Sequence, residues 1–352
     1  MNSRSLLIVA GIAVVLVVLA VMTQPSQDTT AARSALLLPE LPDALVDIEE
    51  VRLETAGAET VATLTRSDAG WSVVERDGYP ADIAKLSEVL LALSEARSIE
   101  AKTANPDYYD RLGVEPIEAE TATGIAVSMS RNGMSLPTVI LGDSVGTSYR
   151  YARLADTAQS LLIDRDPELP RDTGQWLVTD IVDVRGARIQ QVTITHADGE
   201  TVVISKPNAE QSNFDVANVP EDRELQYPGV ANVIGNALRE LKLEDVRRSG
   251  EPTDPSVTTE FRTFDGLIVT LRGYADGERA WLSFQASFDA QQAVDFGTEV
   301  VDESLPDVDT GLDPRAEAEQ INARVTGWEY RIPSYQYDQM TRRLEDLLKA
   351  RS

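Results

Sequence analysis

The sequence predicts an α+β fold, in which a single transmembrane helix at the amino terminus precedes two tandem repeats of an antiparallel sheet covered by a helix. Three observations predict it. An unbroken nonpolar run lies near the amino terminus, apolar and polar residues alternate as in half-buried strands, and one set of landmark residues occurs twice in the same order. The repetition carries the most weight, because it indicates the architecture before any local element is assigned.

The nonpolar run extends from Leu6 to Met22 and is preceded by Arg4. Its length is at the short end for a membrane-spanning helix, which takes about 17–25 residues. The positive charge before the run predicts a cytoplasmic amino terminus and places the bulk of the chain outside. A cleaved signal peptide is the alternative, but the end of the run offers no small-x-small cleavage site. We expect a cytoplasmic stub and an uncleaved anchor within residues 1–23, and a linker over residues 24–40.

The repeats open at Val51 and at Val192, and Val61 and Val202 follow these openings at the same spacing. Three further pairs are Trp71-Ser-Val73 with Phe214-Asp-Val216, Tyr79-Pro80-Ala81 with Tyr227-Pro228-Gly229, and Gly124-Ile-Ala-Val127 with Gly266-Leu-Ile-Val269. The spacing drifts along the chain, as insertions in loops would cause. We therefore predict a first α+β repeat over residues 41–175 and a second over residues 176–352.

Within each repeat, alternating β-branched residues and Asp/Gly turns predict an opening hairpin. A helix follows, beginning near Pro80 or Pro228, because proline is tolerated in the first turn of a helix. Its apolar face would hold Ile83, Leu86, Leu90 and Leu93 in the first repeat, and Val230, Val233, Ile234, Ala237, Leu238 and Leu241 in the second. Strands over residues 125–129, 137–141, 267–271 and 280–284 complete the repeats, so that the helix covers one face of each sheet.

Three segments fall outside the shared pattern. Asn105 and Gly113 are expected to cap and to end a short helix over residues 106–112 of the first repeat. A closing helix would carry Met340, Leu344, Leu347 and Leu348 on one stripe. Residues 298–319 are strongly acidic and contain two prolines, which predicts a solvated insertion in the second repeat.

Composition limits the classes of function. The chain has 352 residues, of which 42% are hydrophobic, enough for two domains with packed cores. It contains no cysteine, which excludes disulfides, thiol catalysis and thiolate metal sites. A formal net charge of −26 repels phosphates, so we predict no nucleic-acid partner. The acidity favours solubility, with a surface for cations or for a basic partner as the alternative.

Two patterns imitate hydrolase or metal chemistry. Gly142-Asp-Ser144-Val-Gly146 fits the Gly-x-Ser-x-Gly nucleophile elbow, but that motif requires a helix after the serine and a partner histidine. Strand-like residues follow instead, which favours a hairpin turn. His196 is the single histidine and has no second histidine to share a metal, so we expect a surface residue beside a turn.

Two further groups of residues also have a simpler interpretation. Asp307, Asp309 and Asp313 imitate a calcium loop, but Gly311 and Ala318 fall at the wrong positions, so a solvated loop is favoured. Trp71, Trp176, Trp281 and Trp328 lie in strand-like patterns, which favours core packing over stacking on a ligand. We therefore predict no catalytic residue, no cofactor-binding residue, no metal ligand and no cofactor.

These landmarks resemble a bacterial family known as domain-of-unknown-function family 4340. The resemblance rests on the anchor, on Leu45-Val-Asp-Ile-Glu-Glu-Val51, on Gly70-Trp71, on Tyr79-Pro80-Ala81-Asp82, and on Asn105-Pro106 with Tyr109-Asp-Arg-Leu-Gly113-Val114. It covers most of residues 36–290. The family is often encoded beside ABC transporters of the gliding-motility type. The resemblance therefore implies a single-pass protein of the bacterial inner membrane, with its carboxyl-terminal bulk in the periplasm and a permease/ATPase complex as partner.

We accordingly expect a non-enzymatic accessory or scaffold subunit of an ABC-type transporter that faces the periplasm and acts through protein–protein binding. The alternative is a periplasmic module that binds a ligand or an envelope polymer between the two repeats, because duplicated modules often place a site at their interface.

Overall fold

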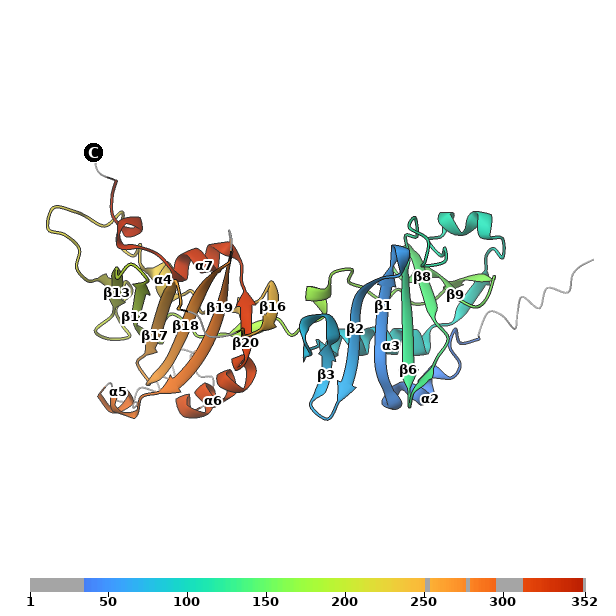
Figure 1. Ribbon diagram of the computed structural model, residues 1–352, viewed down its shortest axis with the longest axis horizontal. Coiled ribbons are helices and arrows are strands. Elements are labelled where there is room, and N and C mark those ends of the chain that lie inside the picture. The colour runs from blue at the N-terminus through green and yellow to red at the C-terminus, as the bar shows by residue number, and fades with distance from the viewer. Residues whose placement is uncertain (1–34, 251–253, 277–278, 296–312, 351–352) are drawn as a thin grey trace, which may run out of the picture. The chain divides into compact units, whose positions relative to one another are not determined.

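The structure is a computed structural model that describes residues 35–250, 254–276, 279–295 and 313–350. Over these residues the chain forms two large antiparallel sheets with a few helices (Figure 1). The chain is thus a mixed protein dominated by antiparallel strands, as the alternating pattern predicted. None of the helices in the described ranges has the length and apolarity of a membrane span, and the predicted anchor at residues 6–22 lies outside those ranges.

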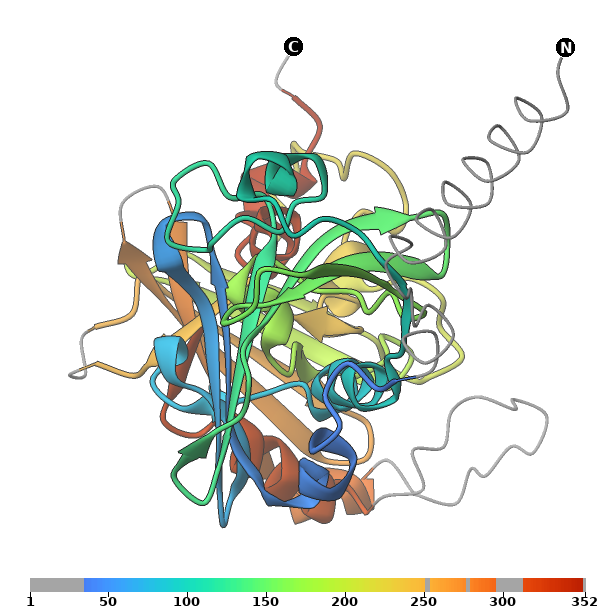
Figure 2. The same cartoon turned by 90° about the vertical axis from the view of Figure 1, so that its right-hand side faces the viewer.

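The first sheet has ten strands in the order β4-β3-β2-β1-β6-β8-β9-β10-β5, with β7 paired to β6. The strands are β1 (Ile48–Thr55), β2 (Glu59–Ser67), β3 (Gly70–Val73), β4 (Tyr79–Pro80), β5 (Ser98–Ala101), β6 (Ile125–Arg131), β7 (Met134–Ser135), β8 (Val139–Val145), β9 (Tyr149–Leu154) and β10 (Ser160–Ile163). The predicted opening hairpin is β1–β2, in which Val51 lies opposite Leu64. Figure 2 shows the twist of these strands.

Helix α3 (Ile83–Glu95) follows β4, as predicted, and lies behind the strands of the first sheet in Figure 1. Leu86, Val89, Leu90 and Leu93 are buried, whereas Ile83 at the first position is 53% exposed and does not belong to the buried face. Two short helical turns, α2 (Leu41–Ala44) and η1 (Leu45–Asp47), precede β1. The predicted helix after Asn105 is a 3-10 helix, η4 (Pro106–Arg111), and the Asn105 side chain accepts from the Asp107 amide.

The second sheet has eight strands in the order β14-β13-β12-β17-β18-β19-β20-β16. They are β12 (Ile189–His196), β13 (Thr201–Ser205), β14 (Asp215–Val216), β16 (Asp245–Arg248), β17 (Val257–Thr263), β18 (Leu267–Asp276), β19 (Arg279–Phe288) and β20 (Trp328–Arg331). A separate pair joins β11 (Asp180–Val182) to β15 (Leu241–Lys242). The helices are α4 (Asn232–Gly235), α5 (Ala290–Asp295), α6 (Pro314–Val325) and α7 (Ser334–Met340), with 3-10 helices η3 (Val74–Arg76), η5 (Thr173–Trp176) and η6 (Leu344–Leu347).

The chain takes the same route through both sheets. In the first sheet the order from β3 to β5 is β3-β2-β1-β6-β8-β9-β10-β5, and in the second it is β14-β13-β12-β17-β18-β19-β20-β16. In each case the first three strands form a meander, and a strand that comes after the helix pairs at the opposite end of the sheet. This strand is β5 in the first sheet and β16, which comes after β15, in the second. Strand β6 therefore corresponds to β17. The predicted match of residues 124–127 with residues 266–269 is wrong by one strand, because residues 267–269 lie in β18.

Strand β17 escaped the sequence pattern because its core positions are only partly apolar. Thr259 and Thr263 are 0% and 1% exposed and alternate with Val257 and Phe261 on the buried face. Threonine at such positions hides the hydrophobic alternation that identifies a strand. The Thr259 hydroxyl donates to the carbonyl oxygen of Met340 at 2.6 Å, which satisfies the buried polar group.

Two predicted helices of the second repeat are much shorter in the structure. The apolar residues from Val230 to Leu241 are largely buried, but only α4 is helical, because Gly235 lies against the ring of Phe214 and Glu240 adopts a φ of 48°. At the end of the chain, α7 stops at Met340, and Arg343 and Asp346 cap the separate turn η6. Of the acidic insertion, residues 298–312 lie outside the described ranges, and residues 314–319 form the beginning of α6 rather than a loop.

Contacts divide the chain into two compact units. The first contains the described part of Met1–Gly70 together with Ile83–Arg171, and the second contains Trp71–Asp82 together with Asp172–Ser352. The change from one unit to the other at 171/172 falls close to the repeat boundary we predicted at 175/176. The segment Trp71–Asp82 differs from that prediction, because it comes from the first repeat and groups with the second unit.

Candidate functional site

Ser144, the centre of the Gly-x-Ser-x-Gly pattern, lies within strand β8 and is followed by the turn at Gly146 and by strand β9. Its hydroxyl donates to Asp166 Oδ1 at 3.0 Å and accepts from Arg150 Nη2 at 3.0 Å. Arg150 also forms an ion pair with Asp166. A nucleophile elbow joins a strand to a helix. The strand–turn–strand arrangement here has the geometry of the hairpin we favoured.

His196 is the last residue of β12, and our prediction that it lies at the surface is wrong. It is 9% exposed, and its Nε2 atom is buried without a hydrogen-bond partner in the part of the chain that the structure describes. Burial follows from register, because His196 lies opposite Val257 on the core face of the sheet. Beside it, Arg343 forms ion pairs with Asp198 and Glu200.

The carboxyls of that cluster hold a terminal segment in place. The Glu200 carboxylate accepts from the Leu344 backbone amide at 2.9 Å. This bond is the main reason that the pKa of Glu200 is lowered, and the nearby Arg343 guanidinium lowers it further. The pKa of Asp198 is also lowered, mainly because its carboxylate accepts a hydrogen bond from the Glu200 backbone amide. The Arg343 guanidinium lowers it further. The cluster therefore links the β12–β13 turn to η6.

The remaining sequence candidates are the acidic residues of the calcium-like pattern and the four tryptophans. Asp307 and Asp309 lie outside the described ranges. Asp313 caps α6 by accepting from the Arg315 amide at 3.2 Å. Among the described residues, no three acidic or histidine side chains gather in a way that could hold a metal ion. Trp176 and Trp328 are buried in the core, as predicted, and Trp71 is half-buried. Trp281 is also buried, but it lies beneath two arginines rather than in the core.

Tyr79, which the segment Trp71–Asp82 contributes to the second unit, joins an aromatic cluster there. Its ring meets Trp328 edge-on with centroids 4.9 Å apart, and meets Tyr330 at 6.2 Å. Tyr79 and Tyr330 are 1% and 0% exposed. Burial raises the pKa of both hydroxyls, which also bond to each other, so both stay neutral at physiological pH. The cluster is a packed core that contains the Tyr79 side chain.

The opposite face of the same sheet carries a group of arginines stacked on a tryptophan, which we call the Arg–Trp face (Trp281, Tyr274, Arg247, Glu329 and Arg331). Because side chains alternate along a strand, Trp281 and Arg331 point away from the buried pair Leu282 and Tyr330. The guanidinium of Arg247 lies 4.2 Å from the Trp281 ring centroid, and that of Arg331 lies 4.5 Å from it. Such stacking is favourable because the ring face is electron-rich.

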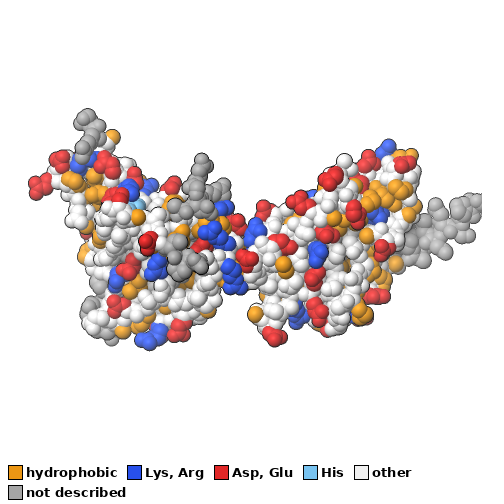
Figure 3. Space-filling model, viewed as in Figure 1, with side chains coloured by type: hydrophobic (Ala, Val, Ile, Leu, Met, Phe, Trp, Pro, Cys, Tyr) orange, Lys and Arg blue, Asp and Glu red, His pale blue; other side chains and the backbone are white. Residues whose placement is uncertain are grey.

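Carboxylates lie beside the arginines of the Arg–Trp face among the described residues. Arg247 Nε lies 2.8 Å from Glu329 Oε2, and Arg331 Nη1 lies 3.8 Å from Asp245 Oδ2, which Arg76 also contacts at 2.7 Å. The Nε atom of Arg331 is buried and has no hydrogen-bond partner among the described residues. Figure 3 shows Lys and Arg side chains gathered over the region of the second unit where Figure 1 labels β16 and β20. In an acidic chain, this is a local concentration of arginine.

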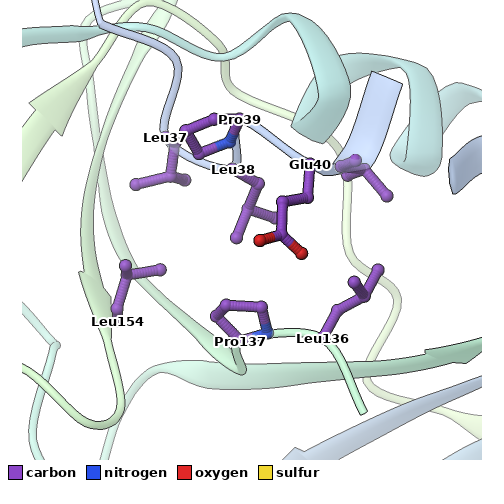
Figure 4. Close-up of a pocket in the computed structure, with 8 residues that line it drawn as sticks. Leu37, Leu38, Pro39, Glu40, Leu136, Pro137 and Leu154 are labelled. Carbon is purple, nitrogen blue, oxygen red and sulfur yellow. The ribbon is translucent and has the colours of Figure 1, made fainter. Parts of the chain in front are cut away.

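A second feature, in the first unit, is a small apolar pocket that we call the Glu40 pocket. It is lined by Leu37, Leu38, Pro39, Glu40, Leu41, Leu136, Pro137 and Leu154, and its cavity volume is about 140 Å³. Figure 4 shows the Glu40 carboxylate directed into the space between Leu38 and Pro137. No residue that the structure describes forms an ion pair or hydrogen bond with that carboxylate.

Sequence reasoning missed both features. The pocket brings together three segments that are distant along the chain, and only the run Leu36-Leu-Leu-Pro-Glu40, apolar residues ending in one acid, marks it in the sequence. The Arg–Trp face depends on strand register, which places Arg247 beside Glu329 and Tyr274 beside Trp281. The pair Arg247-Arg248 in an acidic chain was the signal available for it.

Comparison with known proteins identifies the family. The family described as "Domain of unknown function (DUF4340)" matches residues 71–259. No curated protein and no solved structure shows significant similarity to the chain. The match covers more than half of the 352 residues and includes the Tyr79-Pro80 and Tyr109 landmarks on which the resemblance rested. The chain therefore belongs to the DUF4340 family.

Proposed function

We propose that this protein is a non-enzymatic accessory subunit of an ABC-type transporter, anchored in the inner membrane by residues 6–22 and acting in the periplasm through protein–protein binding. Membership of the DUF4340 family supports the proposal, as do the nonpolar run after Arg4 and the acidic remainder of the chain. The two units would then be copies of one ancestral module. The matching strand order of the two sheets supports that origin.

The observation that carries the proposal is the Arg–Trp face. Arginine, tryptophan and tyrosine are the residues most enriched among those that dominate binding energy at protein interfaces. Here they lie together on one face of a sheet, and the Arg247 side chain is 42% exposed. Stacking on Trp281 limits the freedom of the two guanidinium groups, so less entropy is lost when a partner binds. Guanidinium groups on such a face suit a partner surface that carries carboxylates.

A second way to bind a partner is to add a partner strand to a sheet edge, and the described edges suit that mode poorly. The outer strands of the two sheets are only two residues long in β4 and β14, and four residues long in β5 and β16. Short edge strands are a common way in which proteins prevent strand addition. Binding through a face therefore fits the structure better than binding through an edge.

Co-purification from native membranes tests the proposal. The full-length protein, extracted in mild detergent, should bring down the permease and the ATPase of one transporter in fixed proportion. Charge reversal by Arg247→Glu should reduce the recovered permease severalfold, whereas Arg239→Glu, at a 64% exposed arginine elsewhere in the second unit, should leave recovery unchanged. Isolation of the wild-type protein without either transporter subunit would overturn the proposal.

A further inference from the structure

The Glu40 pocket is preformed by backbone hydrogen bonds. The Leu37 amide donates to the Ala96 carbonyl oxygen at 2.8 Å, and the Leu136 amide donates to the Met129 carbonyl oxygen at 2.9 Å. The third wall, at Leu154, belongs to β9, which pairs with β8 and β10. The three walls are therefore fixed before anything binds, and an occupant would not have to order them.

The size of the pocket matches a single apolar side chain. Its volume is about 140 Å³, and an apolar cavity of about 150 Å³ accommodates one benzene ring. Leucine and proline supply all of the lining except Glu40. An unfilled apolar volume forfeits packing contacts and is destabilising, because the surrounding atoms have no neighbours on one side. A leucine-sized group would restore those contacts.

The charge around the pocket sets the second requirement for an occupant. Residues 40–50 contain five acidic side chains and no lysine or arginine, and Glu40, Asp43 and Asp47 are exposed. Arg66, which reaches this segment, donates to the carbonyl oxygen of Val46 rather than to a carboxylate. The Glu40 carboxylate, directed into the pocket in Figure 4, would be left without a counter-charge by a purely apolar ligand.

Two exposed apolar side chains lie within five residues of the pocket walls in the sequence. Val46, five residues after the wall residue Leu41, is 75% exposed, and Met134, two residues before Leu136, is 59% exposed. Both side chains are available for contact with a partner protein.

We infer that the Glu40 pocket binds a segment of a partner protein in which a leucine, or an apolar side chain of similar size, adjoins a lysine or arginine. The apolar side chain fills the space between Leu38 and Leu136, and the cation pairs with the Glu40 carboxylate. This inference does not depend on the transporter proposal, since it concerns a different unit and a different surface.

Saturation-transfer NMR with a synthetic peptide tests the inference. The full-length protein in lipid nanodiscs is mixed with the blocked peptide Ac-Gly-Ser-Leu-Lys-Ser-Gly-NH₂, with empty nanodiscs as the blank. We expect the leucine methyl protons to receive the strongest saturation. Peptides with serine in place of leucine, or glutamate in place of lysine, should give no signal above the blank.

Variants of the protein separate pocket binding from general attraction to an acidic surface. Glu40→Gln keeps the shape of the side chain and should raise the dissociation constant about two- to fivefold at low salt, which lies within the range for one exposed ion pair. Glu40→Lys should abolish the signal. Glu59→Gln, at another exposed glutamate of the first unit, should change nothing. Equal binding by wild type and Glu40→Gln, equal binding of all three peptides, or no signal from the Leu-Lys peptide would each overturn the inference.

Discussion

Arg188 lies at the centre of a buried ion-pair network in the second unit. Its guanidinium donates to Glu317 at 3.0 and 2.7 Å and to Asp265 at 3.1 and 2.8 Å. Burial by itself would lower the pKa of Arg188, but the bonds to these carboxylates raise it overall. The network joins α6, through Glu317 in its first turn, to the start of β12 and to the turn between β17 and β18. We therefore expect it to hold α6 on the sheet.

Replacing Arg188 by methionine keeps the aliphatic stem and removes the charge. Glu317, whose side chain is 8% exposed, then remains buried without its cation. Loss of one partner of a buried ion pair costs about 3–5 kcal/mol. Asp265 is 30% exposed and can be solvated by water, so we expect a loss of about 3–4 kcal/mol for Arg188→Met. Adding Glu317→Leu removes the stranded carboxylate and should recover about 1–2 kcal/mol of that loss.

Urea unfolding followed by tryptophan fluorescence measures this loss in the correct unit, because all four tryptophans belong to the second unit. The midpoint falls in proportion to the lost free energy of unfolding if the slope stays constant. Arg239→Met, at an exposed site, is the control and should change stability by less than about 0.5 kcal/mol. A loss below about 1 kcal/mol for Arg188→Met, or a double variant less stable than the single one, would refute the reasoning.

Three further outcomes follow from the same unit. Tyr79→Ala should destabilise it by about 3–5 kcal/mol and Tyr79→Phe by about 1 kcal/mol, measured by the same urea unfolding; equal losses would contradict the packing described for the ring. Gly235→Ala would place a methyl group 2.2 Å from an aromatic carbon and should cost more than about 1 kcal/mol, whereas Gly250→Ala, in open space, should be neutral. Because the folded pKa of Glu200 lies below its ordinary 4.5, its stabilising contribution is present above pH 4.5 and is lost as the pH falls through the lowered value. Hydrogen exchange of the Leu344 amide should therefore show weaker protection after correction for intrinsic rates at pH 3 than at pH 6, and unchanged protection would contradict this.

The elements predicted well from the sequence are those whose pattern is local. The hairpin at Val51 and helix α3 follow from the spacing of apolar residues alone. The correspondence of β12 with β1 was predicted from the repetition in the sequence. Strand β17 was missed because threonines occupy half of its core positions. Helix α4 was overestimated because apolar spacing does not reveal that a glycine is held against the Phe214 ring.

The candidate sites depended on contacts that no local pattern contains. Burial of His196 is set by its register against Val257, and the grouping of Tyr79 with the second unit is set by Trp328 and Tyr330. The Glu40 pocket requires Leu136 and the segment from Leu37 to converge across almost a hundred positions of sequence. Such features follow from tertiary packing, so the sequence indicated their residues without indicating their neighbours.

Site-specific photo-crosslinking in native membranes is the most direct test of binding to a transporter through the Arg–Trp face. A photoreactive amino acid is placed at Arg247, and in a second variant at Arg239 as the control on the same unit. We predict an ultraviolet-dependent adduct between the Arg247 position and the transporter permease, identified by mass spectrometry, and none from the Arg239 position. Absence of a permease adduct from the Arg247 position, or equal adducts from both positions, would contradict it.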